Sequence, residues 1–544
     1  MFKKTLLFFH TVKYLKVSQI IHRIRCRFIK PKVSLKSAPN ISRIKNNFSP
    51  VINCSQKIYN KDSFIFLNHK YTPSFPEDWN APTKDKLWLY NLHYFDDLNS
   101  VDSEKRKYLH FDLIQGWIND NPVGYGLGWE SYPMSLRIVN WIKWSLINTE
   151  LKKKWLDSLA IQTRFLNKNL EYHLLGNHLF SNAKALIFSG IYFQGSEANS
   201  WYQQGMEILD KELPVQILYD GGNFELSPMY HSIFLEDLLD IINIHNSFDK
   251  KLPNIILKKV YQMFDWLMVM CHPDGGISFF NDSTLGVAPS LNDLLDYSRR
   301  LSIDYVSKKE NEMAYLKDSG YFRLNNKDIA LIADIAEIGP NYLPGHGHAD
   351  VLSFELSIFG RRVIVNSGIS TYESGTNRST QRGTQAHSTI TIDGENSSEV
   401  WSSFRVARRA KVFNIINSKV GGAIKFSACH DGYKRLKGKV IHCREWLVTD
   451  NLFELKDHIT GHGNHKIISV LPIHPEVIVN KVNSNTVSLK VRGRMVTMSF
   501  EGKGTLLVEN SHYYPEFGLA IDNKKLIYHY NDSLPLNTSI KISW

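Results

Sequence analysis

Residues 353–359 read Ser-Phe-Glu-Leu-Ser-Ile-Phe, so apolar side chains at positions 354, 356 and 358 alternate with polar ones. Successive side chains of a β-strand point to opposite faces of its sheet, and this alternation therefore predicts a strand with one buried face. The same period of two returns in Thr389–Ile392, Val487–Val491 and Met495–Phe500. Turn-forming residues follow or separate these stretches, as at Asp393-Gly394 and Gly493. We therefore expect residues 315–544 to form a large antiparallel β-sandwich.

The middle of the chain has a different period. Leu136, Val139, Ile142 and Leu146 are spaced as one face of a helix, and similar stripes run through residues 233–241 and 257–267. Helical patterns follow one another here without strand-rich stretches, so we expect residues 89–314 to form an all-α domain. Residues 1–88 are expected to form a basic N-terminal helix and an irregular, extended connector that wraps the helical domain.

The charge of the 544-residue chain is concentrated near its start. The net charge is +12, yet residues 1–61 contain 14 Lys or Arg and no Asp or Glu, which leaves 51 basic and 53 acidic residues in the remainder. A nucleic-acid-binding protein of this size is expected to carry its basic residues on the folded body, so this class is disfavoured.

The first residues combine basic and apolar side chains. The stretch from Leu6 to Phe28 has the pattern of a basic amphipathic helix, which either lies on an anionic membrane surface or packs on the body. The apolar run Leu6–Phe9 is too short for the hydrophobic region of a secretory signal. No later run reaches the roughly 20 apolar residues of a transmembrane helix.

Five cysteines are scattered along the chain without a Cys-x-x-Cys pair. We expect isolated, buried thiols, and neither a disulfide framework nor a cysteine-bound zinc ion. Cysteine usage therefore leaves the redox compartment open.

Two polar clusters lie at predicted helix starts. Asn177 and His178 precede an apolar helical run, where both side chains can face a groove; the alternative is a capping Asn177 and a surface His178. Ser227-Pro228 predicts an N-cap followed by the first helical residue. Tyr230 and His231 would then occupy the first turn, near a helix end that favours anions, or would simply be packed there.

A third cluster, His346-Gly347-His348-Ala349-Asp350, precedes the strand at 353–359. Two histidines separated by one residue project to the same side of an extended chain, which suits metal ligation or one catalytic and one ligating imidazole. His387, before another predicted strand, would complete a histidine-rich site.

Aromatic, amide and charged residues gather elsewhere in patterns that suit an acidic sugar. Aromatic rings stack on sugar rings, and Arg or amide groups bind a carboxylate; ordinary core packing is the alternative. The candidate substrate-binding residues are His93, Tyr94, Trp129, Glu130, Tyr132, Arg137, Glu225, His231, Arg382 and Arg405.

The order Gly-Asn-His at 176–178, Ser-Pro-Met-Tyr-His at 227–231, His-Gly-His-Ala-Asp at 346–350 and Ala-His-Ser-Thr at 386–389 resembles the heparinase II/III-like polysaccharide lyases, which share their architecture with alginate and oligoalginate lyases. The resemblance implies an α+β multidomain fold, an incomplete (α/α) toroid followed by an antiparallel β-sandwich, with the site between them. The periods of 3.6 and then 2 agree with that expectation.

The resemblance also implies β-elimination from a uronic-acid-containing glycan, an activity of the carbon–oxygen lyase type. Asn177 would hold the substrate carboxylate, and His178 would act as base or help to neutralise that carboxylate. Tyr230 would be base or acid, and His346 a second acid/base or carboxylate partner. No cofactor is required for this chemistry, and the resemblance suggests the periplasm as the compartment.

The β-domain of the family often holds a structural zinc ion through His, Asp and His. His348 and His387 match two of these positions, but the third is Asn366, and a neutral amide is a poor zinc ligand. Three alternatives follow: Asn366 binds weakly, Asp350 replaces it, or no zinc is held.

Two functions compete at this stage. The first is a lyase that cleaves an acidic polysaccharide, linked to bacterial capsule, O-antigen or exopolysaccharide metabolism. The second is a catalytically silent glycan-binding or polysaccharide-assembly factor. A metal-dependent glycan hydrolase is disfavoured because no convincing carboxylate pair is present.

Overall fold

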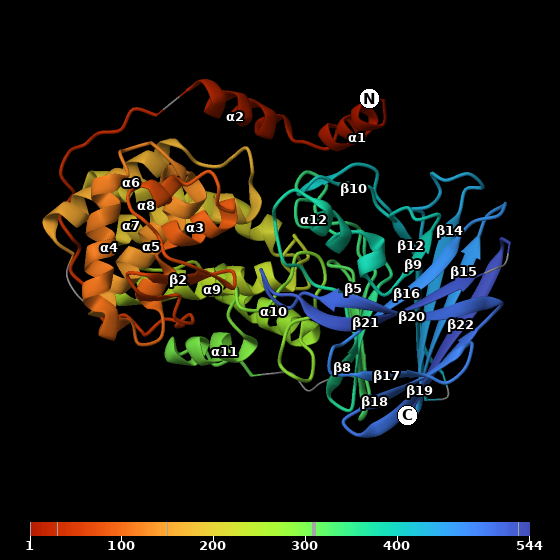
Figure 1. Ribbon diagram of the computed structural model, residues 1–544. Coiled ribbons are helices and arrows are strands. Elements are labelled where there is room, and N and C mark those ends of the chain that lie inside the picture. The colour runs from red at the N-terminus through yellow and green to blue at the C-terminus, as the bar shows by residue number, and fades with distance from the viewer. Residues whose placement is uncertain (1, 30, 149–150, 307–311, 421, 531–532) are drawn as a thin grey trace.

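The computed structural model describes residues 2–29, 31–148, 151–306, 312–420, 422–530 and 533–544. A helical domain and a β-domain lie side by side, and two N-terminal helices lie above them (Figure 1). The predicted order of a helical toroid followed by an antiparallel β-sandwich is confirmed. The predicted domain boundaries stay predictions; the one between residues 314 and 315 falls within strand β4 (Met313–Leu316).

The toroid is built from helices whose apolar stripes face a common core. Its helices are α3 (Lys86–Tyr94), α4 (Lys107–Asp120), α5 (Ser131–Asn148), α6 (Lys153–Lys168), α7 (Gly176–Tyr192), α8 (Ser196–Gln216), α9 (Pro228–Ser247), α10 (Asn254–Met270) and α11 (Leu291–Arg300). Short 3₁₀ helices connect or precede them: η1 (Glu77–Asn80), η2 (Asp96–Asn99), η3 (Ser103–Arg106) and η4 (Leu127–Trp129).

Helix α7 is the most deeply buried of these elements and packs against α5, α8 and α9. Its contact with α8 depends on Gly190, where an added Cβ would lie 2.5 Å from the backbone nitrogen of Tyr202. The two helices are therefore closer than any side chain at this position would allow.

The β-domain consists of two large antiparallel sheets. The first has the order β20-β21-β16-β8-β7-β6-β5-β4, with β9 paired to β16. Its strands are β4, β5 (Tyr321–Asn325), β6 (Ile329–Asp334), β7 (Phe354–Ile358), β8 (Arg361–Ile364), β9 (Ile390–Ile392), β16 (Ile467–Ile473), β20 (Gly504–Tyr513) and β21 (Ile521–Tyr530).

The second sheet has the order β12-β13-β14-β15-β22-β19-β18-β17. Its strands are β12 (Val412–Val420), β13 (Ala423–His430), β14 (Ile441–Val448), β15 (Leu452–Thr460), β17 (Ile478–Lys481), β18 (Thr486–Val491), β19 (Arg494–Glu501) and β22 (Leu536–Ser543). The predicted pair around Gly493 is β18 and β19, with Val491 opposite Arg494. Phe322 of the first sheet stacks on Phe426 of the second at 3.8 Å between ring centroids, in the core between the sheets.

A smaller core joins the two domains. Trp266 and Met270 of α10 pack with Tyr321 and Ile332 of β5 and β6. The indole nitrogen of Trp266 also donates to Ser319 Oγ at 2.8 Å, so the junction combines apolar burial with a satisfied polar contact.

The segment before the toroid differs from the predicted irregular connector. Residues 58–71 form a small antiparallel sheet of β1 (Ile58–Asn60), β2 (Ser63–Phe66) and β3 (His69–Tyr71). Phe64 and Phe66 alternate inward and join the toroid core, because the period of two places both rings on one face. The expectation of an irregular segment is therefore wrong for these residues.

The cysteine prediction is also corrected. Cys429 and Cys443 lie directly opposite each other on β13 and β14 and form a disulfide. Their separation of 14 residues could not predict the disulfide, because the pairing depends on strand register. Cys271 is buried as expected, whereas Cys54 is half-buried and Cys26 is exposed.

The N-terminal region forms two helices, α1 (Phe2–Val12) and α2 (Val17–Phe28), instead of the single helix that was predicted. Within the described residues, no helix is both long enough and apolar enough to cross a bilayer.

Candidate active site

Helices α7 and α9 begin close to the β-domain. Gly176, the first residue of α7, adopts a φ of +55°, and an added Cβ would lie 2.4 Å from Leu343 of the β-domain. Ser227 caps α9, since its hydroxyl accepts a hydrogen bond from the Tyr230 backbone nitrogen, and Pro228 follows as predicted. The N-cap of α7 is Leu175, so the alternative of a capping Asn177 is wrong.

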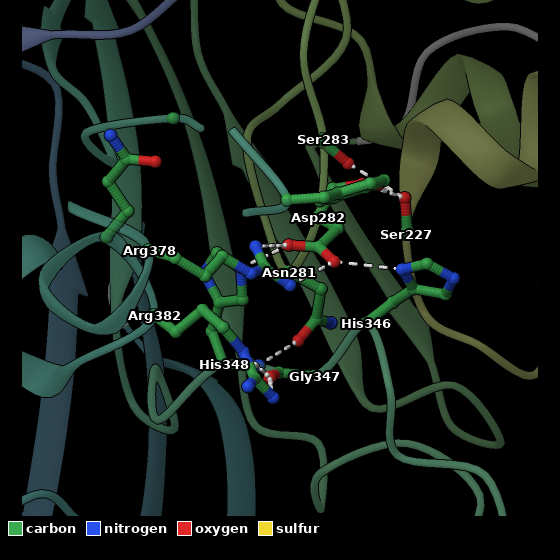
Figure 2. A network of polar contacts seen from close by, with 12 residues as sticks. Ser227, Asn281, Asp282, Ser283, His346, Gly347, His348, Arg378 and Arg382 are labelled. Atoms are coloured by element: carbon green, nitrogen blue, oxygen red, sulfur yellow. Dashed lines mark hydrogen bonds and ion pairs between the residues drawn. The ribbon is translucent and has the colours of Figure 1, made fainter. Parts of the chain in front are cut away.

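His346 is held by a buried carboxylate. Its Nδ1 lies 2.8 Å from Asp282 Oδ2, and Arg378 donates to both oxygens of the same carboxylate, with Nη2 at 2.7 Å from Oδ2 (Figure 2). Burial by itself would raise the pKa of Asp282, but Arg378, His346 and His348 hold that pKa well below its ordinary value. The ionised carboxylate can only accept hydrogen bonds, so it orients the His346 ring with Nδ1 protonated.

Tyr230 lies against the face of the same imidazole. The two ring centroids are 4.1 Å apart, and the Tyr230 hydroxyl is 3.0 Å from the hydroxyl of Tyr372. Burial and the neighbouring Tyr372 raise the pKa of Tyr230 well above its ordinary value. Tyr230 is therefore a protonated phenol at neutral pH and is ready to donate a proton.

His178 sits on the toroid side, where its Nδ1 lies 3.1 Å from Glu171 Oε1 and its ring rests on Tyr132 at 4.5 Å. Burial would lower the pKa of His178, but the Glu171 carboxylate outweighs it and raises the pKa above the ordinary value. Its side chain is 30% exposed, so a ligand can reach this imidazole, and the Glu171 carboxylate favours its cationic form.

Glu225 links the two halves of the site. Its Oε1 accepts a hydrogen bond from the Asn177 backbone nitrogen at 3.1 Å, and its Oε2 lies 3.6 Å from His346 Nε2. This Oε2 is buried and has no hydrogen-bond partner among the described residues. Asn177, Glu225, His346 and Tyr230 therefore form one continuous group, and all four are candidate site residues from the sequence.

A second arginine fixes the loop that carries the histidines. Arg382 donates to Gly347 O through Nη2 at 2.8 Å (Figure 2) and to Ser403 O through Nη1 at 2.9 Å. It is only 1% exposed. Arg382 therefore binds backbone carbonyls, and its predicted direct contact with substrate is corrected to a positioning role.

Four other predicted binding residues are buried in the toroid. His93 contacts Trp79 O and Trp117 Nε1, and Arg137 donates to Gly128 O and His93 O. His231 stacks on Trp266, and the indole nitrogen of Trp129 donates to Asn121 O. None of His93, Arg137, His231 and Trp129 is more than 4% exposed, so direct substrate contact is corrected to packing for all four.

Of the remaining predicted binding residues, Tyr94 is buried, whereas Tyr132, Glu130 and Arg405 lie nearer to solvent. Tyr132 contacts His178, and the ring of Tyr94 meets Tyr132 edge-on at 6.1 Å. Glu130 pairs with Lys86 at 3.0 Å and accepts from Tyr90. Arg405 is exposed and packs over Trp401, next to Phe404, whose ring is 6.0 Å from His346.

His348, in contrast to His346, points into the β-domain. Its Nε2 lies 2.8 Å from Asp282 Oδ1, and its Nδ1 lies 3.3 Å from His387 Nε2. His387 Nδ1 in turn lies 3.0 Å from Asn366 Oδ1. Because the carboxylate and amide oxygens accept hydrogen bonds, the two nitrogens that face each other both carry lone pairs.

This arrangement fits a zinc ion. Two nitrogens bound about 2.0–2.1 Å from a tetrahedral zinc ion lie about 3.3 Å apart, which is the observed separation. Ligand atoms of His348, Asp350 and His387 all lie within 4.8 Å of one another, and a cavity of about 10 Å³ borders His348 and Asp350. Asn366 orients His387, as a second-sphere partner does.

Sequence reasoning missed three residues of this site. Asp282 follows the apolar pair Phe279-Phe280 in a polar run, Asn281-Asp282-Ser283-Thr284, which was a usable signal. Glu171 and Tyr372 stand in stretches without a distinguishing pattern, and only the fold brings them to His178 and Tyr230.

Comparison with known proteins agrees with this architecture. Residues 37–302 match the family model for the heparinase II/III N-terminus, and residues 308–544 match the model for the heparinase II/III-like C-terminal domain. A heparin-sulfate lyase of Bacteroides stercoris is 28% identical over 246 residues, 41% of this chain and 37% of that protein. One of Pedobacter heparinus is 26% identical over 265 residues, 45% of this chain and 40% of that protein. The chain thus matches less than half the length of these two relatives.

Solved structures show the same fold. A crystal structure of heparinase III superposes with a TM-score of 0.69 at 18% identity, covering 96% of this chain and 88% of that one. Chondroitin AC lyase of Streptomyces coelicolor superposes with a TM-score of 0.53 at 9% identity, covering 98% and 79%. With both halves of the chain matched by family models, the protein belongs to the heparinase II/III-like family.

Proposed function

We propose that the protein is a polysaccharide lyase that cleaves a uronic-acid-containing acidic glycan by β-elimination. One observation carries this proposal: an oriented imidazole and a protonated phenol lie 4.1 Å apart between their ring centroids, beside the positive ends of α7 and α9. The heparin-sulfate lyases to which the chain is similar support this reaction class.

The first requirement of the reaction is to neutralise the uronate carboxylate, since proton removal places charge beside it. Asn177 and His178 are consecutive residues in the first turn of α7, so an imidazole, an amide and the positive end of a helix are available there for a carboxylate. Glu171 raises the pKa of His178 and so favours its cationic form, which strengthens that interaction.

The second requirement is a base. His346 donates Nδ1–H to Asp282, which leaves the lone pair of Nε2 available. We assign to this nitrogen the removal of the C5 proton of the uronate. The electrons of the C5–H bond form the C4–C5 double bond, and the C4–O bond to the neighbouring sugar breaks.

The third requirement is an acid for the leaving oxygen. We assign this role to the Tyr230 hydroxyl, which donates its proton to the departing oxygen and becomes a phenolate. Tyr372 at 3.0 Å then donates a hydrogen bond to the phenolate. The products are a free hydroxyl group and an unsaturated uronate end.

The direct test incubates the protein with a panel of uronate polymers and measures ultraviolet absorbance of the unsaturated product. Tyr230→Phe is expected to reduce turnover by at least about 10²-fold with binding retained. Tyr219→Phe, at an 88% exposed tyrosine, is the matched control. If the wild type binds a uronate polymer but yields no unsaturated product, the protein is a glycan-binding or assembly factor instead.

We propose a bacterial capsule, O-antigen or exopolysaccharide as the natural glycan class. The site needs a uronate beside the scissile bond, and these polymers share that feature with glycosaminoglycans. Comparing kcat/KM on acidic bacterial polysaccharides and on heparan sulfate distinguishes the two, and a higher value on heparan sulfate would contradict the bacterial assignment.

We propose that His348, His387 and Asp350 hold a structural zinc ion, with Asn366 outside the ligand set. When bound, the ion would tie the loop that carries His346 and His348 to the segment that carries His387. Asp350→Asn is expected to abolish stoichiometric zinc measured by elemental analysis and to lower the unfolding temperature, whereas Asn366→Ala retains zinc. Equal zinc loss in both variants would place Asn366 among the ligands.

We propose an oxidising compartment, the periplasm, for the mature protein. The Cys429–Cys443 disulfide supports this, because such bonds persist where thiols are not kept reduced. Thiol labelling of the protein in intact cells tests it: complete labelling of both cysteines without reductant would exclude the disulfide and the compartment with it.

A further inference from the structure

The N-terminal helices α1 and α2 lie across the top of both domains, with α2 on the toroid side and α1 on the β-domain side (Figure 1). Specific contacts hold them there. In α1, Thr11 Oγ1 accepts from Trp401 Nε1 at 3.0 Å, and in α2, Gln19 is 4% exposed and contacts Tyr342 O at 3.4 Å. The pair is therefore a docked part of the molecule.

One face of α2 makes the contacts with the body. Gln19 meets Tyr342, the His22 ring lies 5.0 Å from Tyr172, and Cys26 Sγ lies 3.9 Å from His173 Nδ1. Positions 19, 22 and 26 share one side of a helix at about 100° per residue.

The opposite face of α2 carries an apolar stripe that faces solvent. We call it the outer stripe; it consists of Val17, Ile20, Ile21, Ile24 and Phe28. These side chains are 71%, 40%, 58%, 55% and 77% exposed. At about 100° per residue, the outer stripe is centred nearly opposite the body-facing positions. In α1, Phe8 and Phe9 add 53% and 63% exposed rings.

Basic residues border the outer stripe on both sides. Arg25 lies on one flank, and Arg23 and Arg27 lie on the other. No acidic residue occurs in the first 61 residues of the chain. This combination of a solvent-facing apolar stripe with basic flanks characterises helices that lie in the membrane interface.

We infer that α1 and α2 dock the protein on an anionic lipid bilayer through the outer stripe. A second copy of the chain is a poor occupant, because it would bring two basic surfaces together. An acidic glycan would pair with the basic flanks but would leave the five apolar side chains in water. A bilayer with anionic headgroups satisfies both the apolar stripe and its basic border. This surface lies outside the proposed catalytic group, so the inference does not depend on the lyase activity.

The test is cosedimentation of the full-length protein with lipid vesicles. We expect binding to phosphatidylcholine vesicles containing phosphatidylglycerol, weak binding to pure phosphatidylcholine, and a fall in binding as salt increases. The double substitution Ile21→Ser with Ile24→Ser is expected to reduce the vesicle-bound fraction by about tenfold or more.

The matched control replaces two exposed isoleucines of β12, Ile415→Ser with Ile416→Ser, which are 39% and 58% exposed. It should bind vesicles as the wild type does, and both variants should show the wild-type circular dichroism spectrum. Replacing Arg23, Arg25 and Arg27 by Gln should remove most of the salt dependence. Equal binding of wild type and outer-stripe variant, or no preference for anionic vesicles, would overturn the inference.

Binding to a soluble uronate polymer tests whether an acidic glycan, and not a bilayer, occupies the outer stripe. If the outer-stripe variant loses binding to the polymer and keeps binding to vesicles, the surface is a glycan site and the membrane inference is wrong. Turnover of soluble polymer, measured on the same variant, should match the wild type.

Discussion

His346 and His348 are two residues apart and bind the two oxygens of one carboxylate, yet their surroundings differ. His346 is 14% exposed at its side chain and faces Tyr230, whereas His348 is 1% exposed and faces His387. The same residue type on the same anchor thus lies in a reactive position on one side of Asp282 and in a closed, metal-suited position on the other. The residues that cover each imidazole therefore decide its chemistry. Asp282 links the two histidines, because it contacts both.

The largest effect is expected for Asp282→Asn, which removes the shared anchor. It leaves Arg378 buried without its partner, so we expect a loss of about 3–5 kcal/mol in the free energy of unfolding, measured by denaturant titration. Turnover should fall as well. Asp522→Asn, at a 98% exposed carboxylate, is the control, and an unchanged stability would show that the two sides are not coupled.

Asp282→Asn should also change how the free energy of unfolding depends on pH. The folded pKa of Asp282 lies below its unfolded value, so its stabilising contribution is complete above about pH 4 and is lost as pH falls toward the folded pKa. We expect the wild type to lose stability with acid more steeply than Asp282→Asn in this range. Parallel curves would contradict a lowered pKa for this group.

His346→Gln tests the reactive side alone. We expect turnover to fall by about 10³-fold with the unfolding temperature nearly unchanged, because a partly exposed base is removed. His512→Gln, at a 55% exposed imidazole, should be fully active. A His346 variant that keeps wild-type turnover would remove this residue from the proposed mechanism.

His348→Gln tests the closed side. Here we expect the reverse pattern: zinc content falls below stoichiometry and stability falls by about 1–3 kcal/mol, with a smaller loss of turnover than in His346→Gln. Elemental analysis and thermal unfolding measure the two effects. If turnover falls as far as in His346→Gln at unchanged stability, the contrast between the two histidines is wrong.

The smallest effect is expected for Glu171→Gln, on the toroid side. Removing this carboxylate leaves burial as the main influence, so the pKa of His178 falls and the cation is lost at lower pH. The alkaline limb of the kcat/KM profile should therefore move to lower pH. At a fixed alkaline pH, kcat/KM should fall by up to about tenfold. Glu207→Gln, at an exposed position, should leave the profile unchanged.

Much of the fold follows from periodicity. The stripe of Leu136 and its helical neighbours became α5, and the alternation at 353–359 became β7. The expectation of one buried face is wrong for β7, because all five of its residues are buried and Glu355 and Ser357, on the polar face, contact His272 of the helical domain. The sheet at residues 58–71 was missed since its strands are only three or four residues long. The disulfide was missed because strand register, and not sequence separation, brings Cys429 opposite Cys443.

The candidate site, like the fold, contains residues that the sequence placed correctly and residues that it did not. Asn177, His178, Tyr230 and His346 stand in recognisable local patterns, and the structure brings them to one junction. His93, Arg137 and His231 stand in patterns of the same kind but point into the toroid core. Residue type and spacing do not report which way a side chain points once helices pack, so these two groups looked alike in the sequence.

By itself the sequence determined the order of a helical and a β-domain, the helix start at Ser227-Pro228, and the basic, acid-free N-terminal stretch, because these depend on neighbours along the chain. Tertiary structure alone decided that Asp282 anchors His346 and His348, that Tyr372 meets Tyr230, and that the outer stripe faces solvent. Those contacts join residues 64 to 142 positions apart or depend on what covers a helix face, and only packing of the whole chain brings such partners together.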